Sequence, residues 1–179
     1  MGYTHSTKKN YTNTNIKKMA ELSVFTALAF IFSYIESLIP LPIPFPGIKL
    51  GLANLVIVLV LYRFDFASAI GVSLIRNFLN ALTFGNMFGL LYSLAGSILS
   101  VVVMALLKQT KKISLIGVSA IGGITHNLGQ FIVATVLVGY EAILHYLPFL
   151  YFAGIIAGVL IGIFSSLCLK RLPQHLLAD

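Results

Sequence analysis

The chain has 179 residues, of which 58% are hydrophobic and only 9% are charged, and its mean hydropathy is +0.96. This composition excludes a soluble globular domain and predicts a polytopic membrane protein that forms one membrane domain. The formal net charge of +7 does not indicate a nucleic-acid partner, because the basic residues stand in small groups at the ends of apolar runs, as membrane topology requires.

The first 16 residues are rich in Thr, Asn and Lys and lack the apolar core of a signal peptide. We therefore expect residues 1–16 to form a disordered cytosolic tail. Six apolar segments follow, at about residues 17–39, 47–63, 65–83, 86–107, 114–138 and 148–169. They are continuous rather than alternating, which favours an all-α bundle of six transmembrane helices over residues 17–172, with a cytosolic C-terminal tail at 173–179.

Basic residues fall on one side of a chain that crosses the membrane six times. They are Lys8, Lys9, Lys17, Lys18, Arg63, Lys108, Lys111, Lys112, Lys170 and Arg171. The opposite side receives the Pro-rich segment 40–46, the turn at 83–86 and the loop that holds Glu141 and His145. The positive-inside rule therefore predicts that both termini are cytosolic.

Polar side chains interrupt the apolar segments. Arg76, Asn77 and Asn80 lie in the outer half of the third segment, where an ionised side chain is costly unless it meets a partner. The other polar residues within or bordering apolar runs are Glu36, Lys49, Asn54, His126, Asn127 and Gln130. All lie from the middle of a segment toward its outer end, so the pattern predicts an outward-facing binding pocket rather than a pore.

Spacing supports one shared pocket. Arg76 and Asn80 are four residues apart, as are His126 and Gln130, and each pair shares a helix face that should point into the bundle.

A second interpretation of these residues stays open. Single amides such as Asn54, Asn77 and Gln130 often serve only as hydrogen bonds between membrane helices. Arg76 could simply pair with Glu36, Lys49 could extend to the membrane interface, and His126 could be a packing residue.

Two cations, Arg76 and Lys49, together with several amides suit a ligand that carries a phosphate or carboxylate and a ring with donors and acceptors. Aromatic residues that could stack on such a ring are Tyr34, Phe78, Phe84, Phe88, Tyr92 and Phe131. The sequence has no Asp-rich motif pair, no Walker lysine and a single cysteine, Cys168, so we expect neither an enzyme nor a metal site nor a resident cofactor. Active movement of a ligand would then need an ATPase partner.

Several segments together resemble the Gx transporter family. They are GIKLGLANLVIVLVLY (residues 47–62), the intramembrane Arg76 with the polar residues after it, the turn through Phe84 and Gly85, SLAGSILS (93–100) and SLIGVSAIGGITHNLGQ (114–130). Members of this family are often called heptaprenyl diphosphate synthase component I and are related to the S components of energy-coupling factor (ECF) transporters. The resemblance covers about residues 17–172.

The resemblance implies a six-helix S-component-like bundle in the bacterial plasma membrane, which captures a vitamin-like ligand and associates with a T component and two ATPases. S components usually contact the T component through an Ala-x-x-x-Ala surface on their first helix. The nearest equivalent here is Ser23 with Ala27, close to Ala20, which departs from that pattern. Some Gx proteins are associated with flavin trafficking, so a flavin is the favoured ligand.

Two other functions compete with this one. The family name implies an accessory subunit of polyprenyl diphosphate (menaquinone side chain) synthesis, although the acidic metal-binding motifs of that chemistry are missing. Alternatively, the chain is a membrane scaffold in which the polar residues only join helices.

Overall fold

The computed structural model describes residues 4–39, 51–139 and 144–171, and all regular secondary structure in these ranges is helical. The helices are α1 (Thr4–Leu38), α2 (Leu52–Arg63), α3 (Phe66–Thr83), α4 (Met87–Thr110), α5 (Leu115–Val138) and α7 (Leu147–Arg171). Four of them, α1, α4, α5 and α7, contain segments that are long and apolar enough to cross a membrane. The chain is therefore an all-α polytopic membrane protein, which confirms the predicted fold class.

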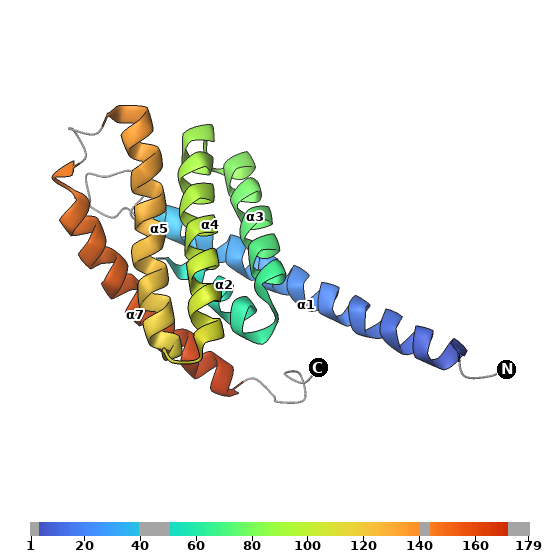
Figure 1. The fold of residues 1–179 in the computed structure, drawn as a ribbon. Helices are drawn as coiled ribbons and strands as arrows, with labels where there is room; N and C mark the ends of the chain where they lie inside the picture. Colours follow the sequence, from blue (N-terminus) through green and yellow to red (C-terminus); the bar gives the residue numbers. More distant parts are fainter. Residues whose placement is uncertain (1–3, 40–50, 140–143, 172–179) are drawn as a thin grey trace.

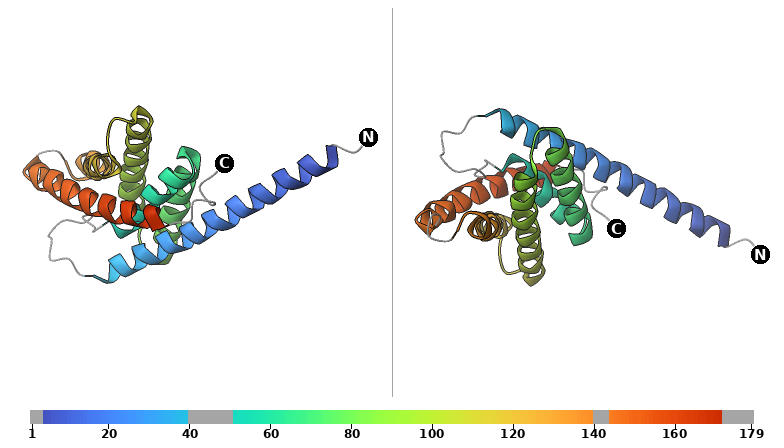
Figure 2. Two further views of the ribbon diagram at one scale, coloured as in Figure 1. Left: turned by 90° about the horizontal axis from the view of Figure 1, so that it is seen from below. Right: turned by 90° about the horizontal axis from the view of Figure 1, so that it is seen from above.

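The observed helices follow the predicted segments closely, and the main difference lies at the N-terminus. The structure draws α1 from Thr4, so residues 4–16 continue the helix where the sequence indicated a disordered tail. This part of α1 projects away from the other helices in all views (Figures 1 and 2). In the structure it is continuous with the apolar part of α1, while the disorder of the tail stays a prediction.

Helix α2 lies at the centre of the molecule. It contacts α1, α3, α4 and α7, whereas α3, α4, α5 and α7 pack in succession around it. Figure 1 shows α3, α4 and α5 side by side, with α7 and α1 crossing them obliquely. Residues 56–61 of α2 are all 5% exposed or less, as expected for a helix that is apolar on every side.

The length of α2 explains why it cannot span a bilayer alone. Its 12 residues rise about 18 Å, less than the ~30 Å of a hydrocarbon core. Gly51 precedes it with φ of 80°, and a Cβ there would lie 2.9 Å from Cδ1 of Ile161, so both conformation and space favour glycine.

Glycines let α5 and α7 approach closely. A Cβ on Gly158 of α7 would lie 2.5 Å from the carbonyl oxygen of Ser119, and one on Gly123 of α5 would lie 2.2 Å from that of Gly154. The hydroxyl of Ser119 also donates to the carbonyl of Gly158 at 2.7 Å. The Gly154, Gly158 and Gly162 repeat is thus a helix-packing surface.

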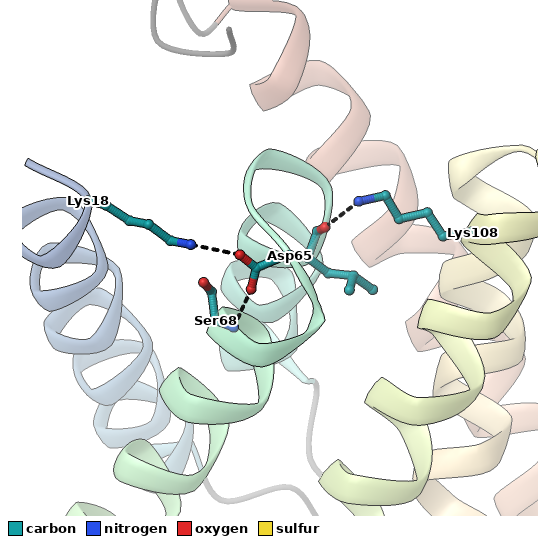
Figure 3. Close-up of polar contacts among 5 residues, drawn as sticks. Lys18, Asp65, Ser68 and Lys108 are labelled. Carbon is teal, nitrogen blue, oxygen red and sulfur yellow. Dashed lines mark hydrogen bonds and ion pairs between the residues drawn. The ribbon is translucent and has the colours of Figure 1, made fainter. Parts of the chain in front are cut away.

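The turn between α2 and α3 joins α1 and α4 at one end of the bundle (Figure 3). The Nζ of Lys18 in α1 lies 2.7 Å from Oδ2 of Asp65, which also caps α3 by accepting from the backbone N–H of Ser68 at 2.7 Å. From α4, Lys108 donates to the carbonyl of Leu61 at 2.6 Å. The hydrogen bond from Lys18, followed by that from Ser68, lowers the pKa of Asp65 to about 2.

A second ion pair fixes α1 beside the same turn. The Nη2 of Arg63 lies 2.6 Å from Oε2 of Glu21, and the Arg63 side chain is only 3% exposed. The ring of Phe64 packs edge-on against Phe25 of α1, with ring centroids 6.0 Å apart. Basic residues of α1, α2 and α4 therefore gather at one end of the molecule.

Candidate functional site

A polar cavity of about 50 Å³ lies toward the other end of the bundle, between six helices and the residue that precedes α2. It is bounded by the C-terminal parts of α1, α3 and α5 and by the N-terminal parts of α2, α4 and α7. The described residues that line it are Ser33, Glu36, Gly51, Asn54, Arg76, Asn77, Asn80, Ser93, Gly123, His126, Asn127, Gln130, Ala153, Gly154, Ala157 and Ile161. Because successive helices run in opposite directions, these segments, which are distant in the sequence, lie at one level of the bundle.

The structure brings together the polar residues that the sequence singled out. Glu36, Asn54, Arg76, Asn77, Asn80, His126, Asn127 and Gln130 all line the cavity. Lys49 lies outside the described residues. The predicted convergence is therefore present for those eight residues, and their role in binding a ligand stays a prediction.

Arg76 is the basic residue with a permanent charge among the described lining residues, and it is only 6% exposed. Its Nη2 donates to Oδ1 of Asn77 at 2.8 Å, whereas its Nε is buried and has no hydrogen-bond partner among the described residues. Glu36, on helix α1, lines the same cavity and brings a carboxylate of opposite charge to the guanidinium. A buried donor without a partner costs about 1–3 kcal/mol, so the Nε of Arg76 calls for an explanation.

Asn77 has its hydrogen-bonding groups engaged within the protein. Its Nδ2 donates to Oγ of Ser97 at 2.8 Å and to the carbonyl of Ser93 at 3.3 Å, both on α4, while its Oδ1 accepts from Arg76. Asn77 therefore joins α3 to α4 and orients Arg76. This arrangement corresponds to the interhelical role that the sequence left open for Asn77.

Asn80 lies one helical turn beyond Arg76 on the same face of α3. Its Oδ1 is buried without a hydrogen-bond partner within the protein. The face thus presents an unsatisfied donor and an unsatisfied acceptor, four residues apart, toward one cavity. Such a pair can bind a ligand edge that carries both an acceptor and a donor.

Glu36 connects the two chain segments that border the cavity on the α1 side. Glu36 is 6% exposed. Its Oε1 accepts a hydrogen bond from the backbone N–H of Gly51, just before α2. Glu36 therefore holds the C-terminal part of α1 against the start of α2.

The α5 residues make the opposite wall. Asn127 donates through Nδ2 to the carbonyl of Leu150 at 2.8 Å, which ties α5 to α7. Gln130 is 8% exposed, and both it and His126 pack against Gly96 of α4, where a Cβ would lie 2.8 Å from the His126 carbonyl oxygen. Asn127 thus has a structural contact in addition to its place in the lining.

Two expectations about the lining change with the structure. Among the described lining residues there is no Phe or Tyr, and Tyr34 and Phe84 instead pack on each other with ring centroids 5.6 Å apart. Conversely, Ser33 and Ser93 line the cavity, although neither was predicted as a site residue. Ser33 lies three residues before Glu36 on the same helix face, a spacing that could have identified it, whereas nothing local distinguishes Ser93.

The candidate coupling residues lie on the surface of α1. Ala20, Ser23 and Ala27 are all exposed, whereas the neighbouring Ala29 is fully buried. The Ser23 hydroxyl donates to the carbonyl of Met19 at 2.9 Å, within its own helix. These three residues are therefore accessible on the surface of α1, and their coupling role stays a prediction.

The fold and the cavity define a helical membrane protein that holds a buried arginine and several amides in one polar pocket. Residues 25–168 match the model of a family described as heptaprenyl diphosphate synthase component I, and the chain belongs to this family. No curated protein and no solved structure matches the chain significantly. In the described residues, no group of three or more His, Cys, Asp or Glu could hold a metal ion.

Proposed function

We propose that the protein is a substrate-binding, S-like membrane subunit of an ECF-type transporter. It holds a flavin or a similar anionic cofactor in the polar cavity and moves it across the membrane with a T component and ATPase subunits. The observation that carries this proposal is Arg76, which is buried in a membrane helix, oriented by Asn77 and left with an unsatisfied Nε at the cavity. Intramembrane ionisable residues mark ligand pathways by default, and a guanidinium matches phosphate or carboxylate.

The size of the cavity adds a requirement. Its volume of about 50 Å³ is well below the roughly 300–1,000 Å³ of small-molecule sites. Entry of a flavin therefore requires the lining helices to move apart. Helix α1 is suited to this movement because its main packing contacts within the described chain are with two helices, α2 and α3.

The outer surface of α1 supports a partner subunit. Ala20, Ser23 and Ala27 form an exposed strip of small residues on the helix that also carries Glu36. A T component that packs on this strip would act on the wall of the cavity. With the basic ends of the helices in the cytosol, the cavity faces the outer side of the membrane.

Substitution of Arg76 tests this function. In the detergent-purified protein, we expect Arg76→Ala to weaken binding of flavin mononucleotide (FMN) by roughly 10–100-fold, because a charge-assisted hydrogen bond contributes about 1.5–3 kcal/mol. Arg63→Ala is the matched control, since it removes an arginine whose side chain is also nearly buried, at the other end of the bundle, and it should leave the affinity unchanged. Unaltered FMN binding by Arg76→Ala, measured by quenching of flavin fluorescence, would remove Arg76 from the site.

The family description favours one second candidate, an accessory membrane subunit of polyprenyl diphosphate synthesis. A diphosphate group would also suit Arg76. This function predicts that Mg²⁺-dependent prenyl elongation by a soluble synthase partner rises when the purified chain is added. Equal elongation with and without the chain would reject it.

A further inference from the structure

The cavity contains its own anion. Arg76 and Glu36 are the formally charged side chains among the described lining residues, with the imidazole of His126 beside them. Both side chains line one cavity of about 50 Å³, where opposite charges attract. Among the described lining residues, the positive charge of Arg76 that would attract an anionic ligand is therefore already balanced by one carboxylate.

A second anion cannot simply be added to this arrangement. Two negative groups that share a poorly solvated site repel each other, and one of them has to be neutralised or displaced. Glu36 is the group that can leave, because it reaches the cavity from α1, whose main packing contacts are with α2 and α3. Arg76 is fixed through Asn77 to α4.

Displacement of Glu36 would also alter the shape of the site. The carboxylate accepts the hydrogen bond from the N–H of Gly51, and this bond holds the end of α1 to the start of α2 across the cavity wall. If Glu36 turned away, that connection would be lost. The cavity, now about 50 Å³, could then widen between α1 and α2.

We propose that Glu36 is an internal substitute for the anionic group of the ligand. A phosphate or carboxylate of the ligand replaces Glu36 beside Arg76, and the release of Gly51 opens the wall between α1 and α2. This inference rests on the proposed function, because it assumes a ligand in the cavity. It makes Glu36 a specificity-determining residue that disfavours weak anions and admits a ligand whose anionic group binds Arg76 more tightly than the protein's own carboxylate does.

Two flavins that differ only in a phosphate test the proposal. Riboflavin and FMN are titrated against the wild-type protein, Glu36→Gln and the control Glu21→Gln, which makes the same change on the same helix at the other end of the bundle. Glutamine can still accept the bond from Gly51, so the fold is retained. We expect Glu36→Gln to tighten FMN binding by at least about tenfold, since one nearby like charge is removed, and to change riboflavin binding less than about threefold.

A structural measurement accompanies the titration. Hydrogen exchange of peptides that contain Gly51 should speed up when FMN is added to the wild-type protein, and Glu21→Gln should leave the FMN-to-riboflavin ratio unchanged. The proposal is overturned if Glu36→Gln weakens FMN and riboflavin alike, because Glu36 is then a contact for the flavin ring. It is also overturned if the ratio of the two affinities does not change.

The failure of the flavin function is a separate result. If neither flavin binds any of the three proteins, the thermal stability of each is measured with inorganic diphosphate. A larger stabilisation of Glu36→Gln than of wild type then supports the role of Glu36 while the flavin proposal fails. Equal stabilisation, or none, overturns both.

Discussion

Gly158→Ala probes the close backbone contact between α7 and α5 with a single methyl group. The new Cβ would lie 2.5 Å from the carbonyl oxygen of Ser119 and 2.7 Å from Cα of Ala120, and both atoms belong to the backbone of α5. To restore an ordinary contact of 3.4 Å, the two backbones must separate by roughly 0.9 Å, which also stretches the hydrogen bond from Ser119 to Gly158. Overpacking costs about 1–3 kcal/mol and a weakened interhelical hydrogen bond about 0.6 kcal/mol.

We therefore expect Gly158→Ala to lower the free energy of unfolding by about 2–3 kcal/mol, or Tm by roughly 4–12 °C for a chain of this length. The assay is reversible unfolding in mixed detergent micelles, followed by circular dichroism and checked by a thermal ramp. Gly71→Ala is the matched control, because it makes the same change inside α3, where a Cβ meets nothing within 4 Å. That variant should be neutral or more stable, since alanine favours helix by about 0.5–1 kcal/mol. Equal stability of Gly158→Ala and wild type, or an equal loss in Gly71→Ala, would refute the reasoning.

Three further predictions concern polar contacts. Asn77→Ala removes the hydrogen bonds to α4, including the one to Ser97, and should both lower the free energy of unfolding by about 1–2 kcal/mol and weaken FMN binding. The control Ser97→Ala leaves the bond to Ser93 in place and should keep most of the affinity. Equal FMN affinity in Asn77→Ala and wild type would contradict a positioning role for Asn77. Glu21→Gln leaves the nearly buried Arg63 side chain without its carboxylate and should lower the free energy of unfolding, measured by denaturant titration, by about 1–3 kcal/mol. An unchanged denaturant midpoint would show that the ion pair does not contribute to stability. Asp65 has a folded pKa of about 2, below its ordinary 3.8, so it stabilises the protein fully above about pH 4 and loses that contribution as the pH falls toward 2. The difference in the free energy of unfolding between wild type and Asp65→Asn, below about 1 kcal/mol at this exposed site, should therefore close in acid, and the difference in Tm with it. A difference that stays constant down to pH 2.5 would exclude the ion pair as its cause.

The helices could be predicted from the sequence because their signals are local. Apolar runs of spanning length and capping residues such as Asp65, Asn86 and Ser114 mark where α3, α4 and α5 begin. The spacing of Gly154, Gly158 and Gly162, one glycine every fourth residue, is likewise a local sign of close helix packing. The start of α1 at Thr4 was not predicted, since a polar segment without an apolar stripe gives no local sign of helix.

The convergence of the polar residues could also be predicted, but their individual roles could not. Depth along each segment placed Arg76, Asn80 and Gln130 at one level, and the cavity lies there. Whether an amide joins helices or stays available depends on the neighbouring helix: Asn77 meets Ser97 of α4, whereas Oδ1 of Asn80 meets no partner within the protein. Nothing in the order of residues encodes that distinction.

The sequence alone determined that this protein is a helical membrane protein with charged ends on one side and a polar pocket toward the other, because hydropathy, charge and spacing act within single helices. The tertiary structure decided which helix lies at the centre, which amides are already satisfied and how small the cavity is. It also decided that Glu36 binds the backbone of Gly51 and lines the same cavity as Arg76. These features depend on the distances between atoms of different helices, and such distances are set only when the helices pack together.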